Sequence, residues 1–261
     1  MSVTFPEPLR LPAGEVHVWW AHARPRSADL IAFLDPIEST RHSALRRAAD
    51  RDRFASAHAL TRVVLASYQR SYVDDVAIRA TCKLCGAEGH GKPALWDTDP
   101  LFTFSYAYAG ARVGVAVARV PVGLDVVMMS DADEATRVAA LAPAESAALS
   151  ERPSSQWPHA VTLTWARKEA LLKATGDGLS VPLADLVVTA SNADPALVAW
   201  AGGPELKHVQ LADLFPGAGH VAALALLTED AIDPELNLPY TVMEFDGEPV
   251  LAAAAEPPSI A

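Results

Sequence analysis

Alternation of apolar and polar residues predicts a strand over residues 15–20 (EVHVWW), with Val16, Val18 and Trp20 on one face. Apolar runs bounded by glycine or proline predict further strands along the chain. They cover residues 101–106, 113–120, 122–128, 186–189, 198–201 and 221–227. A turn near Gly110 separates the first two of these segments, and Pro121 leads into the third.

Apolar residues at helical spacing predict a long helix over residues 30–70 and a second helix over 132–149, interrupted around Pro143. The clearest helical pattern covers residues 161–174, and Gly176 and Gly178 follow it as a stop signal. The segment 82–93 contains three glycines and a proline, which predicts a loop.

Helices and strands without regular alternation indicate an α+β fold rather than a doubly wound sheet. A similar order of helices and strands occurs on both sides of about residue 120, although no sequence repeat proves it. We therefore expect two similar halves, residues 1–120 and 121–245, followed by a flexible tail over 246–261 whose last ten residues are frayed.

Composition narrows the class of protein. The chain has 261 residues, 51% of them hydrophobic, which excludes wholesale disorder and suffices for a sizeable core. The net charge of −11 argues against a nucleic-acid partner. No apolar stretch approaches the ~20 residues of a membrane span, and the N-terminus lacks a signal-peptide pattern, so we expect a cytoplasmic protein without a membrane partner.

The two cysteines, Cys82 and Cys85, form a Cys-x-x-Cys pattern followed by His90. A zinc site needs a fourth ligand, and there is no second cysteine pair to supply it. A redox pair is an alternative, but the flanking pattern is not that of a thioredoxin. We interpret the segment as a glycine-rich loop with two reduced cysteines.

Two segments carry residues suited to chemistry. In Val-Gly-Leu-Asp (122–125), Gly123 permits close backbone approach beside the Asp125 carboxylate, although a solvated aspartate at a strand end is the simpler interpretation. In residues 165–173, Trp165, Glu169 and Lys173 are spaced four apart and share one helix face. The ordinary alternative there is a surface ion pair beside a core tryptophan.

Two further segments concentrate positive charge. The loop Gly91-Lys92-Pro93 presents a lysine to an anion, or is an exposed turn. Residues 41–62 contain six arginines and two aspartates, a local net charge of +4 within an acidic chain. Arginine clusters of this kind bind phosphate groups well, although a solvated helix face has the same composition.

These segments, in this order, resemble an Sfp-type 4′-phosphopantetheinyl transferase. The match rests on the Val-Gly-Leu-Asp strand (122–125), the Trp-x-x-Lys-Glu-x-x-x-Lys helix (165–173) and the Gly-Lys-Pro loop (91–93). Arg53-Phe54, with Arg62 eight residues after Phe54, is similar to the family's first helix. The Cys-x-x-Cys-Gly segment with His90 resembles an actinobacterial variant of the loop motif.

The resemblance implies a pseudo-twofold α+β protein with the site between its halves. It implies transfer of phosphopantetheine from coenzyme A to a serine of an acyl or peptidyl carrier protein, releasing adenosine 3′,5′-bisphosphate. Asp125 and Glu169 would hold Mg²⁺ and Lys173 would contact the phosphates. The residues implied to bind coenzyme A are Arg47, Arg62, Lys92, Tyr108 and Lys168. Either Glu169 or a water on the metal would accept the serine proton.

Two positions depart from the family pattern. Val127 occupies the position of a second acid, and Ala107-Tyr108 occupy the position of a Ser-His pair when counted back from Asp125. We expect an active enzyme, because water can fill a vacated metal position. The alternatives are a degenerate member that binds coenzyme A or a carrier without transfer, and an unrelated α+β binding protein.

The resemblance favours carriers of polyketide or nonribosomal peptide synthesis and, because two halves already form the site, a monomer. Carrier proteins are typically acidic and coenzyme A carries phosphates, so the net charge of −11 does not exclude them as partners. The local positive charge of residues 41–62, together with Lys92, Lys168 and Lys173, would meet both.

Overall fold

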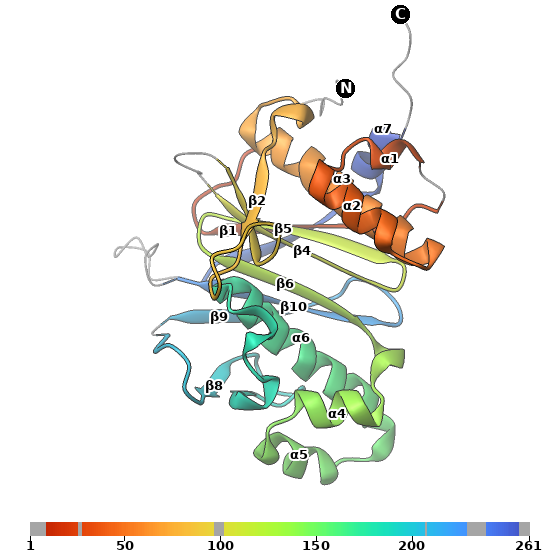
Figure 1. Ribbon diagram of the computed structural model, residues 1–261. Coiled ribbons are helices and arrows are strands. Elements are labelled where there is room, and N and C mark those ends of the chain that lie inside the picture. The colour runs from red at the N-terminus through yellow and green to blue at the C-terminus, as the bar shows by residue number, and fades with distance from the viewer. Residues whose placement is uncertain (1–8, 26–27, 97–101, 207, 229–238, 256–261) are drawn as a thin grey trace, which may run out of the picture.

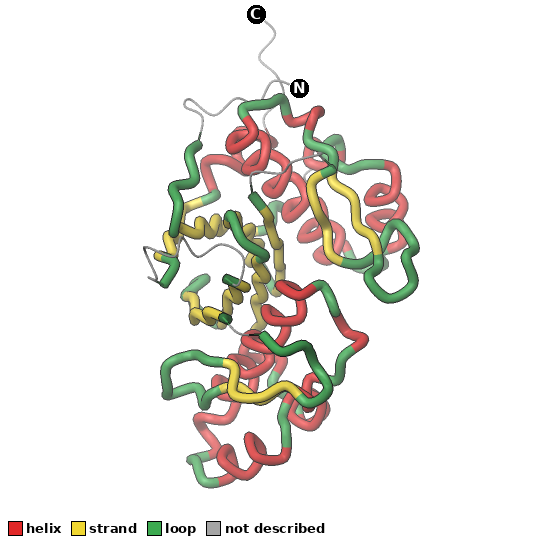
Figure 2. Tube along the Cα trace, turned by 90° about the vertical axis from the view of Figure 1, so that its left-hand side faces the viewer, coloured by secondary structure: helices red, strands yellow, loops and turns green. Residues whose placement is uncertain are grey.

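Two β-sheets occupy the middle of the molecule, and one long helix covers the outer face of each (Figure 1). The structure is a computed structural model, which describes residues 9–25, 28–96, 102–206, 208–228 and 239–255. In the view turned by 90°, helices again lie above and below a zone of strands (Figure 2). The arrangement confirms the predicted α+β class.

The first sheet has the strand order β11-β1-β5-β4. Its strands are β1 (Glu15–His22), β4 (Thr103–Ala109), β5 (Arg112–Ala118) and β11 (Thr241–Asp246). The β1–β5 and β5–β4 pairs are antiparallel, whereas β11 pairs with β1 in parallel, Glu15 opposite Thr241. The predicted strands near residues 15, 103 and 113 are thus confirmed, and β11 was not predicted.

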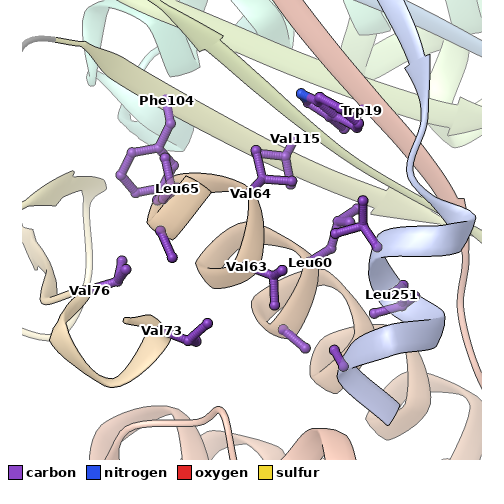
Figure 3. Close-up of a cluster of buried hydrophobic side chains, with 14 of the residues drawn as sticks. Trp19, Leu60, Val63, Val64, Leu65, Val73, Val76, Phe104, Val115 and Leu251 are labelled. Atoms are coloured by element: carbon purple, nitrogen blue, oxygen red, sulfur yellow. The ribbon is translucent and has the colours of Figure 1, made fainter. Parts of the chain in front are cut away.

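Helix α3 (Ala48–Gln69) packs on the outer face of this sheet with α7 (Glu248–Ala255) beside it. Figure 3 shows Leu60, Val63 and Val64 of α3 pointing into the core shared with Trp19, Val115 and Leu251. Leu251 is fully buried, so α7 contributes to this core. The predicted flexible tail over 246–261 overlaps β11 and α7, and residues 256–261 lie outside the described residues.

The prediction of one continuous helix over residues 30–70 is wrong, because the segment contains three helices. The segment forms α1 (Ala28–Ile31), α2 (Pro36–Ala44) and α3. Asp35 caps α2, since its side chain accepts the Glu38 N–H and Glu38 accepts the Asp35 N–H, with Pro36 in the first turn. Leu45 then takes an extended conformation and separates α2 from α3.

The second sheet has the order β6-β10-β9, all antiparallel, and α6 (Trp157–Thr175) covers its outer face. Its strands are β6 (Val122–Met128), β9 (Val209–Leu214) and β10 (His220–Leu227). The inner faces of the two sheets meet in an apolar layer that contains Val18 and Ala116 of the first sheet and Leu124 and Leu224 of the second. Strand β9 was not predicted.

Shorter elements surround α6. They are α4 (Glu134–Ala140), α5 (Pro143–Ser150), β7 (Leu186–Val188) and β8 (Leu197–Trp200), of which the last two form a separate hairpin. The predicted interruption at Pro143 is confirmed, because Pro143 begins α5. Helix α6 ends at Gly176, whose φ of 79° forms a left-handed cap.

The segment expected to be a loop is part of a hairpin. Strands β2 (Ile78–Thr81) and β3 (Lys92–Leu95) pair antiparallel, so Lys92 and Pro93 lie in a strand and residues 82–91 form the connection. Gly91 has a φ of 105°, and a Cβ there would lie 2.8 Å from the Cys82 Cα, so glycine is required at the point where the chain re-enters the strand.

Strand β11 pairs with β1 of the first sheet, and α7 packs beside α3. The division near residue 120 stays a prediction. Among the helices that the structure describes, none is both long and apolar enough to cross a membrane.

Candidate functional site

Strand β6 and helix α6 approach each other unusually closely at Gly123. A Cβ on Gly123 would lie 2.5 Å from the Ala174 nitrogen and would overlap the Ala170 carbonyl oxygen, so only glycine fits. Because side chains alternate along a strand, Asp125 and Val127 point to the same side as Gly123, toward α6. The close contact therefore brings Asp125 against the helix face that carries Glu169 and Lys173.

Lys173 and Asp125 form an ion pair between the helix and the strand. Lys173 Nζ donates to Asp125 Oδ1 at 2.7 Å and to the Leu124 carbonyl oxygen at 3.0 Å. Asp125 is buried, and burial raises the pKa of its carboxyl group, although the Lys173 ammonium opposes that shift. The predicted helix face thus faces a buried acid rather than solvent.

Glu169 lies one helical turn before Lys173 and is also buried. Burial and the negative charge of Asp125 both raise the pKa of Glu169, while Lys173 lowers it. Glu169 Oε1 and Asp125 Oδ2 are buried and have no hydrogen-bond partner among the described residues. Two unpartnered carboxylate oxygens are costly in a protein interior unless a proton or a cation completes them.

This donor set fits a magnesium ion. Mg²⁺ binds oxygen ligands, and one or two carboxylates with substrate phosphates are its usual protein set. Asp125 and Glu169 supply two carboxylates, with an unpartnered oxygen on each. Val127 lies on the same side of β6 and is 8% exposed, so this chain offers an apolar side chain where a third carboxylate would stand. The metal role of Asp125 and Glu169 stays a prediction.

A cavity of about 750 Å³ lies beside this cluster and reaches from the hairpin to the end of α6. That volume is in the range of sites for small molecules and cofactors. Its lining comes from three places in the chain: the β2–β3 hairpin with Lys83, His90 and Lys92, strand β4 from Phe104 to Tyr108, and the end of α6 with Lys173 and the following residues 176–178 and 180.

Lys92 lies where the sequence motif predicted a cation. Its Nζ donates to the Ala174 carbonyl oxygen at 2.7 Å and to the Val122 carbonyl oxygen at 3.1 Å, joining the hairpin to β6 and α6. Burial lowers the pKa of Lys92 to about 8. Near neutral pH, Lys92 therefore places a positive charge at the cavity wall.

Two tyrosines of β4 line the cavity. The sequence analysis singled out Tyr108, which is partly exposed, and missed Tyr106. Two residues apart on a strand, the two side chains point to the same side. Burial raises the pKa of both phenols, so both remain neutral hydrogen-bond donors. The alternation within the predicted strand was the signal that could have identified Tyr106.

Arg62 is not among the residues that line the cavity, and its role in binding coenzyme A stays a prediction. It is buried on α3, where its guanidinium contacts Glu38 at 2.9 Å and Asp35 at 3.5 Å. His58 also contacts Glu38, at 2.8 Å. The Arg62 donors thus hold α2 against α3, which the sequence did not reveal because α2 and α3 were predicted as one helix.

Lys168 is likewise a structural residue. It is fully buried, and its Nζ pairs with Glu145 of α5 and donates to the Ala140 carbonyl oxygen at 2.8 Å. Its neighbour Arg167 is also fully buried and pairs with Asp213 at 2.6 Å. Helix α6 therefore uses two consecutive cations to hold α5 and β9, and Lys168 is not among the residues that line the cavity.

Arg47 is the N-cap residue of α3, is exposed, and is not among the residues that line the cavity. The positive charge of residues 41–62 is thus divided: Arg62 is buried, Arg53 pairs with Asp50, and Arg41 donates to the Gly89 carbonyl oxygen in the hairpin connection. The cluster does not form one phosphate-binding surface at the cavity.

Comparison with known proteins identifies what this arrangement is similar to. The sequence model of the 4′-phosphopantetheinyl transferase superfamily matches residues 121–225, which include Asp125, Glu169 and Lys173. The chain is 28% identical over 234 residues to 4′-phosphopantetheinyl transferase HetI of Nostoc sp., covering 85% of this chain and 91% of the relative.

Two solved structures are similar to part of this chain. Holo-[acyl-carrier-protein] synthase of Thermotoga maritima has 24% identity and a TM-score of 0.36, covering 41% of this chain and 62% of that chain. A holo-(acyl-carrier-protein) synthase of Bacillus anthracis, in complex with CoA (3′,5′-ADP), has 21% identity and a TM-score of 0.35, covering 41% of this chain and 95% of that chain.

Proposed function

Since residues 121–225 of this chain match the sequence model of the 4′-phosphopantetheinyl transferase superfamily, we propose that the chain transfers phosphopantetheine from coenzyme A to a serine of an apo carrier protein, as an Sfp-type enzyme does. The observation that carries the proposal is the Asp125–Lys173–Glu169 cluster beside the cavity. It places two unpartnered carboxylate oxygens and a lysine together within the matched segment.

The cavity supplies the charge that coenzyme A requires. Lys92 and Lys173 present ammonium groups from β3 and α6, and Tyr106 and Tyr108 add neutral donors from β4. Transfer builds negative charge on the phosphoryl oxygens and on the leaving bisphosphate, so fixed cations and donors lower the barrier. The proposal gives no role to Arg62 and Lys168, which are held in buried ion pairs with Glu38 and Glu145, or to Arg47, which is exposed and outside the cavity lining.

Asp125 and Glu169 would hold Mg²⁺, which when bound would neutralise charge on the phosphates of coenzyme A. Lys173 holds Asp125 in place through its 2.7 Å contact and keeps a positive charge at the cavity wall. The raised pKa of Glu169 suits a carboxylate that takes up a proton, here from the carrier serine as it attacks the β-phosphorus.

The experiment combines the purified chain, coenzyme A, Mg²⁺ and an apo carrier protein and measures the mass of the carrier. We expect the carrier to gain the mass of phosphopantetheine, with equimolar formation of adenosine 3′,5′-bisphosphate. A panel of acyl and peptidyl carriers, including those of polyketide and nonribosomal peptide synthesis, identifies the preferred substrate. No mass gain with any carrier would refute the proposal.

Glu169→Ala separates transfer from binding. We expect this variant to lose at least a hundredfold in turnover, because it removes one carboxylate of the cluster, while it still binds the carrier protein. Asp185→Asn, a change of the same charge at a residue of another element, is the matched control and should retain turnover. If Glu169→Ala turns over at the wild-type rate, the cluster is not the reaction site.

A further inference from the structure

The connection between β2 and β3 gathers the two cysteines of the chain and a histidine at one point. The ligand atoms of Cys82, Cys85 and His90 all lie within 4.8 Å of one another, and Cys85 Sγ lies 3.5 Å from His90 Nε2. Both cysteines are free rather than joined by a disulfide. We propose that these three side chains bind a zinc ion.

The donor atoms suit zinc in kind and in spacing. Zinc binds thiolates at about 2.3 Å and imidazole nitrogens at about 2.0–2.1 Å, so two ligand atoms of a tetrahedral site lie about 3.5–3.8 Å apart. The Cys85–His90 separation of 3.5 Å already matches that value. Magnesium and calcium prefer oxygen ligands, and iron–sulfur clusters usually require four thiolates, so the donor set selects zinc.

The backbone of the connection holds these side chains in position. The Cys82 N–H donates to the Ala87 carbonyl oxygen at 2.9 Å, and the Gly86 N–H donates to the Cys82 carbonyl oxygen at 2.8 Å. The backbone N–H groups of Cys85 and Leu84 also donate to the Cys82 sulfur, so the turn holds that sulfur on the same side as Cys85 and His90.

Counting ligands in the sequence argued against zinc, because no second cysteine pair exists. The fourth ligand need not come from the protein, since two cysteines and one histidine form a complete protein set for a site whose fourth position holds water or an exogenous ligand. Cys82 and His90 both line the large cavity, so the fourth position is accessible from it. The ion would fix the segment that leads directly into Gly91 and Lys92.

The test measures bound metal in the full-length chain, purified without chelators. We expect about one zinc per chain by elemental analysis, and, after exchange with Co²⁺, a thiolate-to-cobalt charge-transfer band in the near ultraviolet. Because the chain has two cysteines, C82S/C85S removes every thiolate, and the zinc content should fall at least tenfold. Glu88→Gln, an exposed change in the same connection, is the matched control and should keep its zinc.

Three results would overturn the proposal. One is wild-type protein with native circular dichroism but neither zinc nor a cobalt band. Another is zinc that remains in C82S/C85S. The third is a thiol titration that finds no free thiol until a reductant is added, which would make the cysteines a redox pair. The folding control is the melting profile of C82S/C85S, recorded with chelator present. If the profile is normal, the variant is folded, and its lack of zinc results from the missing thiolates.

Discussion

Lys173 Nζ lies 2.7 Å from Asp125 Oδ1, so the last turn of α6 is joined to the middle of β6 by an ion pair whose acid is buried. Lys173→Met leaves the Asp125 carboxylate buried without its counter-charge. We expect the free energy of unfolding to fall by about 2 kcal/mol, between the values for exposed and fully buried pairs. Urea denaturation measures this change.

A double-mutant cycle separates stability from transfer at this pair. Asp125→Asn combined with Lys173→Met removes both charges, so we expect most of the lost stability to return. Turnover should remain at least a hundredfold below wild type, because neither the metal-binding carboxylate nor the cation is restored. If turnover returns with stability, the pair has a structural role alone.

Gly123→Ala tests the close contact of β6 and α6. The added Cβ would lie 2.5 Å from the Ala174 nitrogen, and the backbone of a helix cannot move aside as a side chain can. We expect the free energy of unfolding to fall by about 3 kcal/mol. Ala225→Gly is the control, because Ala225 pairs with Gly123 across the sheet and its loss of a methyl should cost about 1 kcal/mol. Equal losses in the two variants would contradict the close contact.

Val127→Glu would add a third carboxylate on the side of β6 that carries Asp125. Without metal, a third buried acid beside two others should lower the melting temperature. With Mg²⁺ the melting temperature should recover, and the Mg²⁺ concentration for half-maximal turnover should fall several-fold. Val127→Gln, of the same shape without the charge, should show neither response. If the melting temperature of Val127→Glu does not change with Mg²⁺, the result would argue against metal binding at this site.

Lys92 predicts a pH dependence of coenzyme A binding. Because burial lowers its pKa to about 8, the folded chain loses this charge above that pH, and we expect KM for coenzyme A to rise there. Lys92→Arg keeps the charge and should move the rise to higher pH. Since the unfolded chain keeps Lys92 protonated up to about pH 10.5, this group also makes stability increase between pH 8 and 10.5. A pH-independent KM would show that the Lys92 charge is not used.

Glu38 predicts a loss of stability in acid. Burial opposes ionisation of Glu38, but the hydrogen bond and charge of His58 and the charge of Arg62 outweigh it and lower its pKa to about 2. A carboxyl group with a lowered pKa stabilises the fold above its unfolded pKa of 4.5, and that stability disappears as the pH falls toward 2. The shift of the Glu38 pKa corresponds to about 3 kcal/mol. We therefore expect Glu38→Gln to lower the free energy of unfolding by about 3 kcal/mol at pH 7.

Denaturation at several pH values measures this contribution. The difference between wild type and Glu38→Gln should shrink as the pH falls from 4.5 toward 2. Glu134→Gln is the control, because Glu134 is an exposed carboxylate paired with Arg137 on α4, and its loss should leave the free energy of unfolding almost unchanged at every pH. A difference that stays constant down to pH 2 would mean that Glu38 is not ionised in the folded chain.

Local patterns predicted the elements that carry the candidate cluster, but not the positions of several cations. The strand over 122–128 and the helix over 161–174 follow from periodicity, and the spacing of Glu169 and Lys173 places them on one face. Lys92 was found through its motif. The ion pairs of Arg62 and Lys168 were not predicted because their partners, Glu38 and Glu145, come from other helices, and sequence spacing carries no information about such contacts.

The elements that were missed depend on tertiary contacts. Strand β9 and strand β11 are stabilised by pairing with β10 and β1, and β11 is largely exposed apart from that edge. Helix α7 has an apolar, alanine-rich sequence that is also common in frayed tails, and the burial of Leu251 against α3 distinguishes the two. Asp35 and Pro36 are typical of a helix start and could have indicated where α2 begins. The continuous helical spacing of apolar residues favoured a single helix instead.

The parallel pairing of β1 with β11 determines the order in which the chain can fold during synthesis. Trp20 Nε1 donates to Glu244 at 2.7 Å across 224 residues, and residues 15–20 of β1 pair with residues 241–246. Until the ribosome has released that late segment, β1 is an unpaired edge beside an apolar core that lacks α7. The first sheet therefore begins with the earliest strand to emerge but is completed only by one of the last segments. We expect nascent chains stalled before residue 241 to require a chaperone.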